Sequence, residues 1–276
     1  MPDILRLALA QMCSGDTHNV NIATMRDMAA QAAGQEADLL ALPEVAGLMN
    51  RNRKVAQTQV VDATDDPFIA ACQKAAAHHG VWLHDGSTPI RANDGRFLNH
   101  TTLIDHTGAI RAEYDKVHLF DVQIEGQAPI GESKRFAPGE ALVLADTPWG
   151  GLGLTICYDL RFPYLYRTLA QAGATVIFVP SAFTIPTGRA HWEVLLRARA
   201  IETGAFIVAA AQSGSHADGR ETYGHGMIVD PWGQILLNQG EGERLDVVDL
   251  DLTRVAHARA QIPALQTGRD VPLKTV

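Results

Sequence analysis

The stretch GLGLTICYDLRFP, residues 151–163, changes character at its centre. Its first half is an apolar run typical of a buried strand, and the run ends at Cys157, where a polar turn begins. Helical periodicity over Tyr164–Ala172 and a second apolar run, TVIFVP at 175–180, follow it. Strand, helix and strand in this order predict a βαβ unit, and ligand clefts in α/β sheets form at the carboxyl ends of strands. The sequence therefore predicts a sheet-centred fold with Cys157 at the sheet edge where a ligand cleft is expected.

Strand and helix patterns alternate through the rest of the chain. Upstream, a strand pattern at Ile4–Met12 precedes a helix pattern at Val20–Ala33, and Gly80 closes a helix predicted at Asp65–His79. A turn signal at His106–Gly108 predicts a β-hairpin. The remaining predicted elements are strands at Asp38–Leu42, Val81–Leu83, Thr101–Asp105, Ile110–Tyr114, Ala205–Ala211, Gly226–Val229, Ile235–Leu237 and Leu245–Leu250, and a helix at Arg189–Thr203. The pattern indicates the α/β class, and a four-layer α-β-β-α sandwich would accommodate it.

Composition limits the kinds of protein that this chain can be. It has 276 residues, 46% of them hydrophobic, with no linker-like stretch, which favours one domain over residues 1–276. A net charge of -8 without a basic stripe argues against nucleic acid as a partner. We find no secretory signal and no apolar run long enough for a membrane span. Three cysteines without a CxxC pair argue against disulfides or a zinc ribbon, and they fit a reducing cytoplasm.

Ionisable residues follow two other predicted strands, as Cys157 follows the run GLGLTI. Glu44 comes directly after the apolar run LLALP, and Lys116 follows IRAEY. Either residue alone could be a solvated loop residue. If the three converge on one sheet edge, they supply a nucleophile, a base that activates it and a cation for an oxyanion. That combination predicts hydrolysis of an amide bond.

Other chemistries have weaker support in the sequence. Cys72 lies on the apolar side of a predicted helix and, like Cys13, is interpreted as a packing residue. The histidines at 78, 79 and 84 do not have the spacing of a closed zinc set, although a metal-dependent amidohydrolase that uses them stays an alternative. A GxSxG elbow and a GxGxxG loop are both absent from the sequence.

Three motifs resemble the signatures of the nitrilase superfamily of carbon-nitrogen hydrolases: LPE at 42–44, YDKVHLF at 114–120 and ICYDLRFP at 156–163. The resemblance extends over essentially the whole chain. Three further stretches are similar to the branch that contains omega-amidases and deaminated glutathione amidases: GESKRFAPG at 131–139, PSAFTIPTGRAHWEVLLRARAIE at 180–202 and YGHGMIVDPWG at 223–233. The chain departs from that branch at Gly226 and in VAGLMNRNRK, 45–54, which lacks the usual aromatic residue.

The resemblance implies an α-β-β-α sandwich, no cofactor, no metal and a catalytic triad that falls on Glu44, Lys116 and Cys157. It also implies that Glu132 is an auxiliary carboxylate on the substrate side. We expect the backbone N–H of Tyr158 to share the oxyanion with Lys116. The resemblance further implies a homodimer or larger even assembly, and the tail at about 263–276 is predicted to pack on the partner subunit.

The predicted reaction is hydrolysis of a non-peptide amide in a small carboxylate-bearing molecule, through a thioester on Cys157. A substrate of the deaminated glutathione type is favoured over the omega-amidase substrates 2-oxoglutaramate and 2-oxosuccinamate. Arg189 is the residue predicted to hold the carboxylate of a Cys-Gly leaving group, with a solvated helix-start arginine as the alternative. Another aliphatic amidase, an N-carbamoyl hydrolase and a catalytically silent binding module remain open, but the last would show a broken triad.

Overall fold

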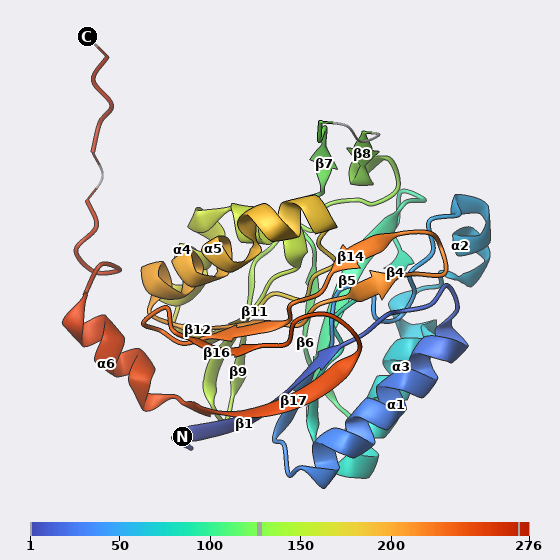
Figure 1. The fold of residues 1–276 in the computed structure, drawn as a ribbon, viewed down its shortest axis with the longest axis horizontal. Helices are drawn as coiled ribbons and strands as arrows, with labels where there is room; N and C mark the ends of the chain where they lie inside the picture. The colour runs from blue at the N-terminus through green and yellow to red at the C-terminus, as the bar shows by residue number, and fades with distance from the viewer. Residues whose placement is uncertain (1, 126–128, 270, 276) are drawn as a thin grey trace.

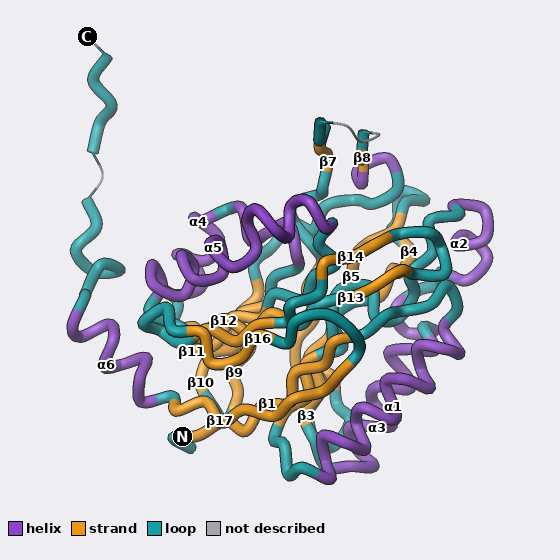
Figure 2. The backbone as a smooth tube through the Cα atoms, viewed as in Figure 1, coloured by secondary structure: helices purple, strands orange, loops and turns teal. Residues whose placement is uncertain are grey.

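The computed structural model describes residues 2–125, 129–269 and 271–275, and two main sheets pack face to face within them (Figures 1 and 2). The first sheet contains both parallel and antiparallel neighbours, because β1, β2 and β3 are parallel whereas β17 runs antiparallel to β1. Its strands, in spatial order, are β17 (Arg244–Asp251), β1 (Ile4–Gln11), β2 (Leu39–Ala41), β3 (Trp82–His84), β5 (Phe97–Ile104) and β4 (Thr88–Arg91), with β6 (Ile110–Asp115) also paired to β5.

The second sheet has a parallel centre, β10-β11-β12, flanked by antiparallel strands. Its strands, in spatial order, are β16 (Ile235–Asn238), β15 (Met227–Val229), β12 (Phe206–Ala209), β11 (Ala174–Phe178), β10 (Gly150–Leu154) and β9 (Val143–Thr147). The helices α4 (Pro163–Gln171) and α5 (Ile185–Thr203) cover this sheet, and α1 (His18–Gly34) and α3 (Pro67–His79) cover the first sheet (Figure 2). The predicted α-β-β-α sandwich is confirmed.

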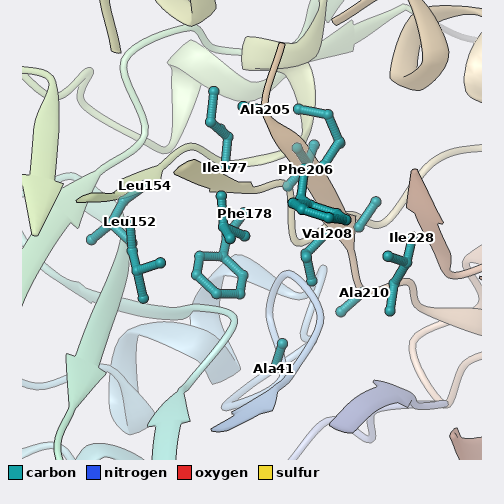
Figure 3. Packing of buried hydrophobic residues seen from close by; sticks show 14 of the residues in the cluster. Ala41, Leu152, Leu154, Ile177, Phe178, Ala205, Phe206, Val208, Ala210 and Ile228 are labelled. Atoms are coloured by element: carbon teal, nitrogen blue, oxygen red, sulfur yellow. The ribbon is translucent and has the colours of Figure 1, made fainter. Parts of the chain in front are cut away.

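Strand β1 shows why the two sheets pack together. Its side chains alternate, so Leu5, Leu7 and Leu9 lie in the core between the sheets, whereas Ala8 and Ala10 face the helices α1 and α3. Side chains from the second sheet complete the inter-sheet core, where β10, β11 and β12 contribute most of the residues (Figure 3). Each leucine buried there contributes about 1.5–3 kcal/mol of transfer free energy.

Helix ends mostly follow the sequence signals. The carboxylate of Asp66 caps α3 by accepting hydrogen bonds from the backbone of Phe68 at 2.9 Å and Ile69 at 3.0 Å, and Gly80 ends the helix with a φ of 68°. The prediction that α5 begins at Arg189 was wrong, since the helix begins at Ile185. Pro186 lies in its first turn, where a missing N–H interrupts no helical hydrogen bond.

Several short elements were not predicted from the sequence, because a few residues carry too little periodicity. These are α2 (Arg53–Gln59), α6 (Thr253–Gln261), β4, β7 (Asp121–Val122), β8 (Ile130–Gly131), β9, β13 (Ser213–Ser215), β14 (Glu221–Tyr223), and the 3₁₀ turns η1 (Ala63–Asp65), η2 (Glu132–Lys134) and η3 (Cys157–Arg161). The η2, η3 and β14 segments border the site described below.

The C-terminal segment leaves the body of the molecule after α6 (Figure 1). Arg167 and Gln171 on α4 donate hydrogen bonds to the carbonyl of Leu265, and beyond that point Val271 and Leu273 are exposed. Within the predicted tail of 263–276, residues 270 and 276 lie outside the described part of the chain. No helix in the described ranges is long and apolar enough to cross a membrane.

Candidate active site

Glu44, Lys116 and Cys157 meet at one end of the sandwich and line the same cavity. Glu44 follows β2 and Lys116 follows β6 in the first sheet, whereas Cys157 follows β10 in the second sheet. The expected meeting along one sheet edge was therefore wrong in one respect. The residues meet across the two sheets, and the packing of the sheets on each other brings them together.

Glu44 is buried, and each of its carboxylate oxygens accepts hydrogen bonds. Oε1 accepts from Lys116 Nζ at 2.9 Å and from Asn99 Nδ2 at 2.9 Å. Oε2 accepts from the backbone N–H of Ala182 at 2.9 Å, so the second sheet also holds this carboxylate. These bonds fix the orientation of a group that is only 5% exposed.

A tight turn presents Glu44 to the cavity. The next residue, Val45, has a φ of 52°, which is unusual for a β-branched residue, and its N–H donates to Ser87 Oγ at 2.7 Å. Gly86 packs directly under this turn, because a Cβ atom there would lie 1.9 Å from the carbonyl oxygen of Pro43. A glycine at 86 is therefore needed for the turn to sit at this depth.

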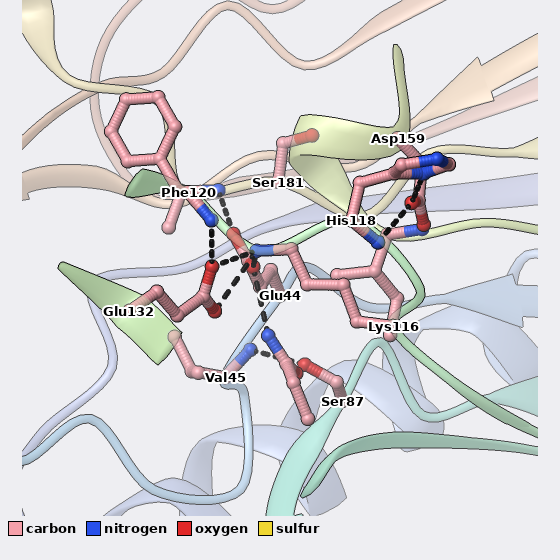
Figure 4. Close-up of polar contacts among 12 residues, drawn as sticks. Glu44, Val45, Ser87, Lys116, His118, Phe120, Glu132, Asp159 and Ser181 are labelled. Carbon is pink, nitrogen blue, oxygen red and sulfur yellow. Dashed lines mark hydrogen bonds and ion pairs between the residues drawn. The ribbon is translucent and has the colours of Figure 1, made fainter. Parts of the chain in front are cut away.

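Lys116 bridges two carboxylates (Figure 4). Besides its bond to Glu44, its Nζ donates to Oε2 of Glu132 at 3.0 Å and to Oε1 at 3.1 Å. Glu132 is in turn held by the backbone N–H of Phe120 at 2.6 Å. Burial acts to lower the pKa of Lys116, but the charges of Glu132, Glu44 and Cys157 outweigh it and raise that pKa well above its usual value. Lys116 is thus a fixed ammonium ion, 2% exposed.

Cys157 occupies a strained position at the first residue of η3. Its φ is 50°, and its N–H donates to the carbonyl of Pro180 at 3.0 Å. Burial and the nearby Glu44 carboxylate raise the pKa of the Cys157 thiol well above its usual value, and Lys116 opposes that shift. In the resting site the sulfur therefore carries a proton, beside a carboxylate that can accept it.

Asp159 was not predicted from the sequence, although it ties the cationic and nucleophilic segments together. Its Oδ2 accepts from Tyr114 Oη at 2.7 Å and from the N–H of Ile156 at 2.9 Å, and its Oδ1 accepts from the N–H of His118 at 3.0 Å. The ring of His118 also bonds Oδ1 at 2.7 Å and contacts the hydroxyl of Tyr164. The only sequence signal was the presence of these residues inside YDKVHLF and CYDLRFP.

The cavity has a volume of about 820 Å³ and combines apolar walls with charged groups. Tyr158 lines it, with its ring packed edge-on against Phe120 at 5.0 Å between centroids. The N–H of Tyr158 belongs to the first turn of η3, where helical N–H groups have no partner within the helix. The arginines that line the cavity are Arg51, Arg135, Arg161 and Arg220.

Arg189 does not belong to the arginines that line the cavity in the described part of the chain. It is exposed on α5. The side chains that line it at this end of α5 come from the first turn, Ile185 to Thr187. The predicted contact between Arg189 and a substrate carboxylate therefore has no geometric support, because the helix begins earlier than expected and Arg189 falls beyond its first turn.

The histidines and the other cysteines are placed elsewhere. Burial lowers the pKa of His84 to about 3, and its ring stacks on Phe178, whereas His78 and His79 lie at the end of α3. In the described ranges, no three His, Cys, Asp or Glu side chains are grouped to hold a metal. Cys72 lies on the buried face of α3, and Cys13 lies outside the cavity lining given by the described residues.

This arrangement can perform nucleophilic acyl transfer. A thiol beside a carboxylate, with an ammonium ion and a free helical N–H nearby, provides a nucleophile, a base and positive charge for an oxyanion. The arginines add positive charge for an anionic substrate.

A family model described as carbon-nitrogen hydrolase matches residues 6–260. The chain is 41% identical over 268 residues to a deaminated glutathione amidase of Yersinia enterocolitica, covering 96% of this chain and 93% of that protein. The NitFhit protein of C. elegans superposes with a TM-score of 0.89 at 36% identity, covering 97% of this chain and 65% of that one.

An amidase from Nesterenkonia sp. AN1 superposes with a TM-score of 0.77 at 28% identity, covering 94% of this chain and 98% of that chain. That structure is of a mutant of the amidase and shows the result of Michael addition of acrylamide at its active-site cysteine. With the family match over most of the chain, the α-β-β-α fold and a relative of this similarity, the protein belongs to the carbon-nitrogen hydrolases of the nitrilase superfamily and is similar to deaminated glutathione amidases.

Proposed function

We propose that this protein hydrolyses the amide bond between the 2-oxoglutarate acyl group and the Cys-Gly part of deaminated glutathione, with Cys157 as nucleophile. The observation that supports this most is the buried contact of Glu44 with Lys116 at 2.9 Å, beside Cys157 in an arginine-lined cavity. Deaminated glutathione carries a carboxylate at each end, which suits such a cavity. The similarity to deaminated glutathione amidases supports the same substrate.

Catalysis begins with proton transfer from Cys157 to Glu44 as the sulfur attacks the amide carbon. The raised pKa of the thiol means that this proton moves during attack, and the carboxylate that receives it is already oriented by Asn99 and Ala182. The carbonyl oxygen becomes an oxyanion, which accepts hydrogen bonds from Lys116 and from the N–H of Tyr158. A preorganised donor of this kind contributes roughly 3–4 kcal/mol.

Glu44 then gives its proton to the amide nitrogen, the C–N bond breaks and the amine leaves. A thioester to Cys157 remains. Glu44, again a carboxylate, removes a proton from a water molecule that attacks the thioester, and the acid leaves while the thiol is restored. Glu132 takes no part in proton transfer; by accepting two hydrogen bonds from Lys116 it keeps the ammonium ion in position.

Assays with two amides that share an acyl group test the substrate. We expect kcat/KM for deaminated glutathione to exceed kcat/KM for 2-oxoglutaramate, because only the first offers a second carboxylate to the cavity. Both rates come from one preparation by following the release of the acid, with Cys157→Ala as the background. A ratio below one would reject deaminated glutathione as the preferred substrate and favour the simple amide.

We also propose that residues 1–276 act as one domain and assemble as a homodimer or larger even oligomer, with the tail after α6 packing on a partner. The exposed side chains of Val271 and Leu273 support this, because apolar residues of a tail gain stability when a neighbour covers them. Sedimentation at micromolar concentration tests it, and a strict monomer would reject it. A cytoplasmic setting is proposed too, since the described cysteines are free and Cys157 must stay reduced to act.

A further inference from the structure

Arg51, Arg135 and Arg220 form a group at the cavity, here called the arginine rim. They come from distant parts of the chain: the loop before α2, the end of η2 and the β13-β14 hairpin. Arg161, in contrast, belongs to the η3 turn that carries Cys157. The arginine rim takes no part in the proposed reaction steps, so its positive charge must serve another purpose at the cavity.

Arg135 ties the arginine rim together. Its Nη1 donates to the carbonyl of Arg51 and its Nη2 to the carbonyl of Asn50, each at 3.0 Å. Its guanidinium also lies over the rings of Phe97, at 5.9 Å, and Phe136, at 6.0 Å. Because each outer nitrogen of Arg135 donates to a backbone carbonyl of the Arg51 loop, Arg135 positions that loop and adds a fixed charge.

Arg220 is also held in place but keeps free donors. Its Nε donates to Asp218 Oδ2 at 2.8 Å, and its Nη2 pairs with the same oxygen at 2.6 Å. The hairpin that carries it is anchored by His216, whose ring bonds Thr222 Oγ1 at 2.7 Å and the Ser14 carbonyl at 2.9 Å. The Nη1 side of Arg220 is left for another acceptor.

The positive charge of this region exceeds the nearby negative charge. Arg53 also acts on Arg135. The acids beside the arginine rim are Asp218, whose pKa is held low against the effect of burial by Arg220 and Arg51, and the cavity residue Glu221, whereas Glu44 and Glu132 are paired with Lys116. In the described part of the chain, the side chain of Arg51 has no hydrogen-bond partner. Like charges held together this way destabilise the free protein, and an anion would relieve them.

The arginine rim and Lys116 line the same cavity, so the scissile amide and the far carboxylate of one substrate can both be bound there. Arg135 directly follows η2, and its backbone N–H bonds the carbonyl of Glu132, the residue that contacts Lys116, at 2.9 Å. A Cys-Gly unit spans about 7 Å from its amide nitrogen to its terminal carboxylate, which places that carboxylate well away from the scissile bond.

We propose that Arg51 and Arg220 form a subsite for the terminal carboxylate of the leaving peptide, with Arg135 as the residue that positions Arg51. The inference rests on the proposed function, and it names the groups that select a peptide over ammonia as the leaving group. Arg51 is exposed and Arg220 is partly exposed, so the subsite faces solvent. That location suits the half of the substrate that must depart before water can attack the thioester.

The test compares deaminated glutathione with its C-terminal carboxamide, in which glycinamide replaces glycine and the scissile bond is unchanged. For the wild-type protein we expect kcat/KM of the acid to exceed that of the amide by roughly 10- to 100-fold, as for a charge-assisted hydrogen bond. Arg51→Gln and Arg220→Gln should each reduce this ratio to within about threefold of one. Arg26→Gln, on the solvent side of α1, is the matched control and should keep the wild-type ratio.

Each variant serves as its own reference, because a loss of folded protein lowers both rates and leaves the ratio unchanged. Equal wild-type rates on the acid and the carboxamide would overturn the subsite while leaving the proposed function standing. A wild-type preference that survives in both Gln variants would also overturn it, and so would loss of the preference in Arg189→Gln alone. Failure of the wild-type protein to cleave either compound would remove the proposed function and the subsite with it.

Discussion

Cys157 combines a left-handed backbone conformation and near-complete burial with the nearby charges of the Glu44 carboxylate and the Lys116 ammonium ion. We expect Cys157→Ser to fold with an unchanged melting temperature to within a few degrees, but to lower kcat by at least 1,000-fold, because a hydroxyl is harder to ionise than a thiol and no other group can form the acyl intermediate. Steady-state kinetics beside a thermal melt measure this. A variant that keeps a tenth of the wild-type rate would contradict the covalent mechanism.

Lys116→Arg tests the oxyanion role at constant charge. The ammonium ion of Lys116 is 2% exposed and fits between two carboxylates, so a larger planar guanidinium displaces one of them. We expect kcat to fall at least 100-fold, the effect of losing one preorganised oxyanion donor. Lys134→Arg, on the exposed side of η2, is the matched control. Wild-type kinetics in Lys116→Arg would remove this residue from the oxyanion site.

At the residue level, the sequence predicted the meeting of Glu44, Lys116 and Cys157, because each one follows an apolar run. It did not predict the arginine rim. Arg51 and Arg220 lie in loops without periodic patterns, and only the packing of a hairpin against the loop before α2 makes them neighbours. Arg189 was chosen in their place because the start of α5 was placed four residues too late.

The hydrogen bonds of Asp159 join two elements, the end of β6 and the turn η3. Asp159→Asn keeps the shape but places an amide donor opposite a backbone N–H. We expect unfolding free energy to fall by about 1.5–3 kcal/mol, the value of a hydrogen bond to a charged group, and kcat to fall more than KM rises, since Lys116 and Cys157 lose their common support. Denaturant titration and kinetics measure both effects.

Asp249→Asn serves as the control for that variant. Asp249 pairs with Arg6 on an exposed part of the first sheet, so its loss should change unfolding free energy by less than about 1 kcal/mol. Equal effects of the two substitutions would mean that Asp159 has no special supporting role. A stability loss in Asp159→Asn with an unchanged kcat would mean that it supports the fold alone.

Element predictions succeeded where local signals were strong. The strand Ile4–Gln11 and the helix Pro67–His79 show clear periodicity, and Gly80 marks a true helix end. The short η2 turn carries both Glu132 and Lys134 and has no periodicity to detect. Its position is fixed by tertiary contacts such as the bond from Phe120 to Glu132, which no local pattern encodes.

At the scale of the whole molecule, a buried acid makes stability depend on pH. Asp85 is fully buried and accepts bonds from Thr101 and Thr102, and burial raises its pKa to about 6. The folded protein therefore holds this proton more tightly than the unfolded chain does. Its contribution is complete below the unfolded pKa of about 4 and is lost as the pH rises through about 6.

Asp85→Asn removes this titration. We expect the unfolding free energy of the wild-type protein, minus that of the variant, to decrease by about 2.5 kcal/mol between pH 4 and pH 7, at roughly 1.2 kcal/mol per pH unit in the middle of that range. Urea titrations of both proteins at several pH values measure the difference. Taking the difference cancels the other groups, such as His84, whose lowered pKa acts in the opposite direction. A difference that is independent of pH would contradict the raised pKa.

Glu44 accepts hydrogen bonds from Ala182 beside the second sheet and from Lys116 beside the first, whereas Arg51 and Arg220 lie in surface loops. In the proposed function, bond breaking and the choice of leaving group therefore rest on different parts of the molecule. We expect substitutions in the surface loops at 50–53 and 218–221 to change which amine is accepted more than they change the position of the nucleophile. If the arginine subsite acts as proposed, grafting these surface segments would redirect a hydrolase of this shape to a new leaving group.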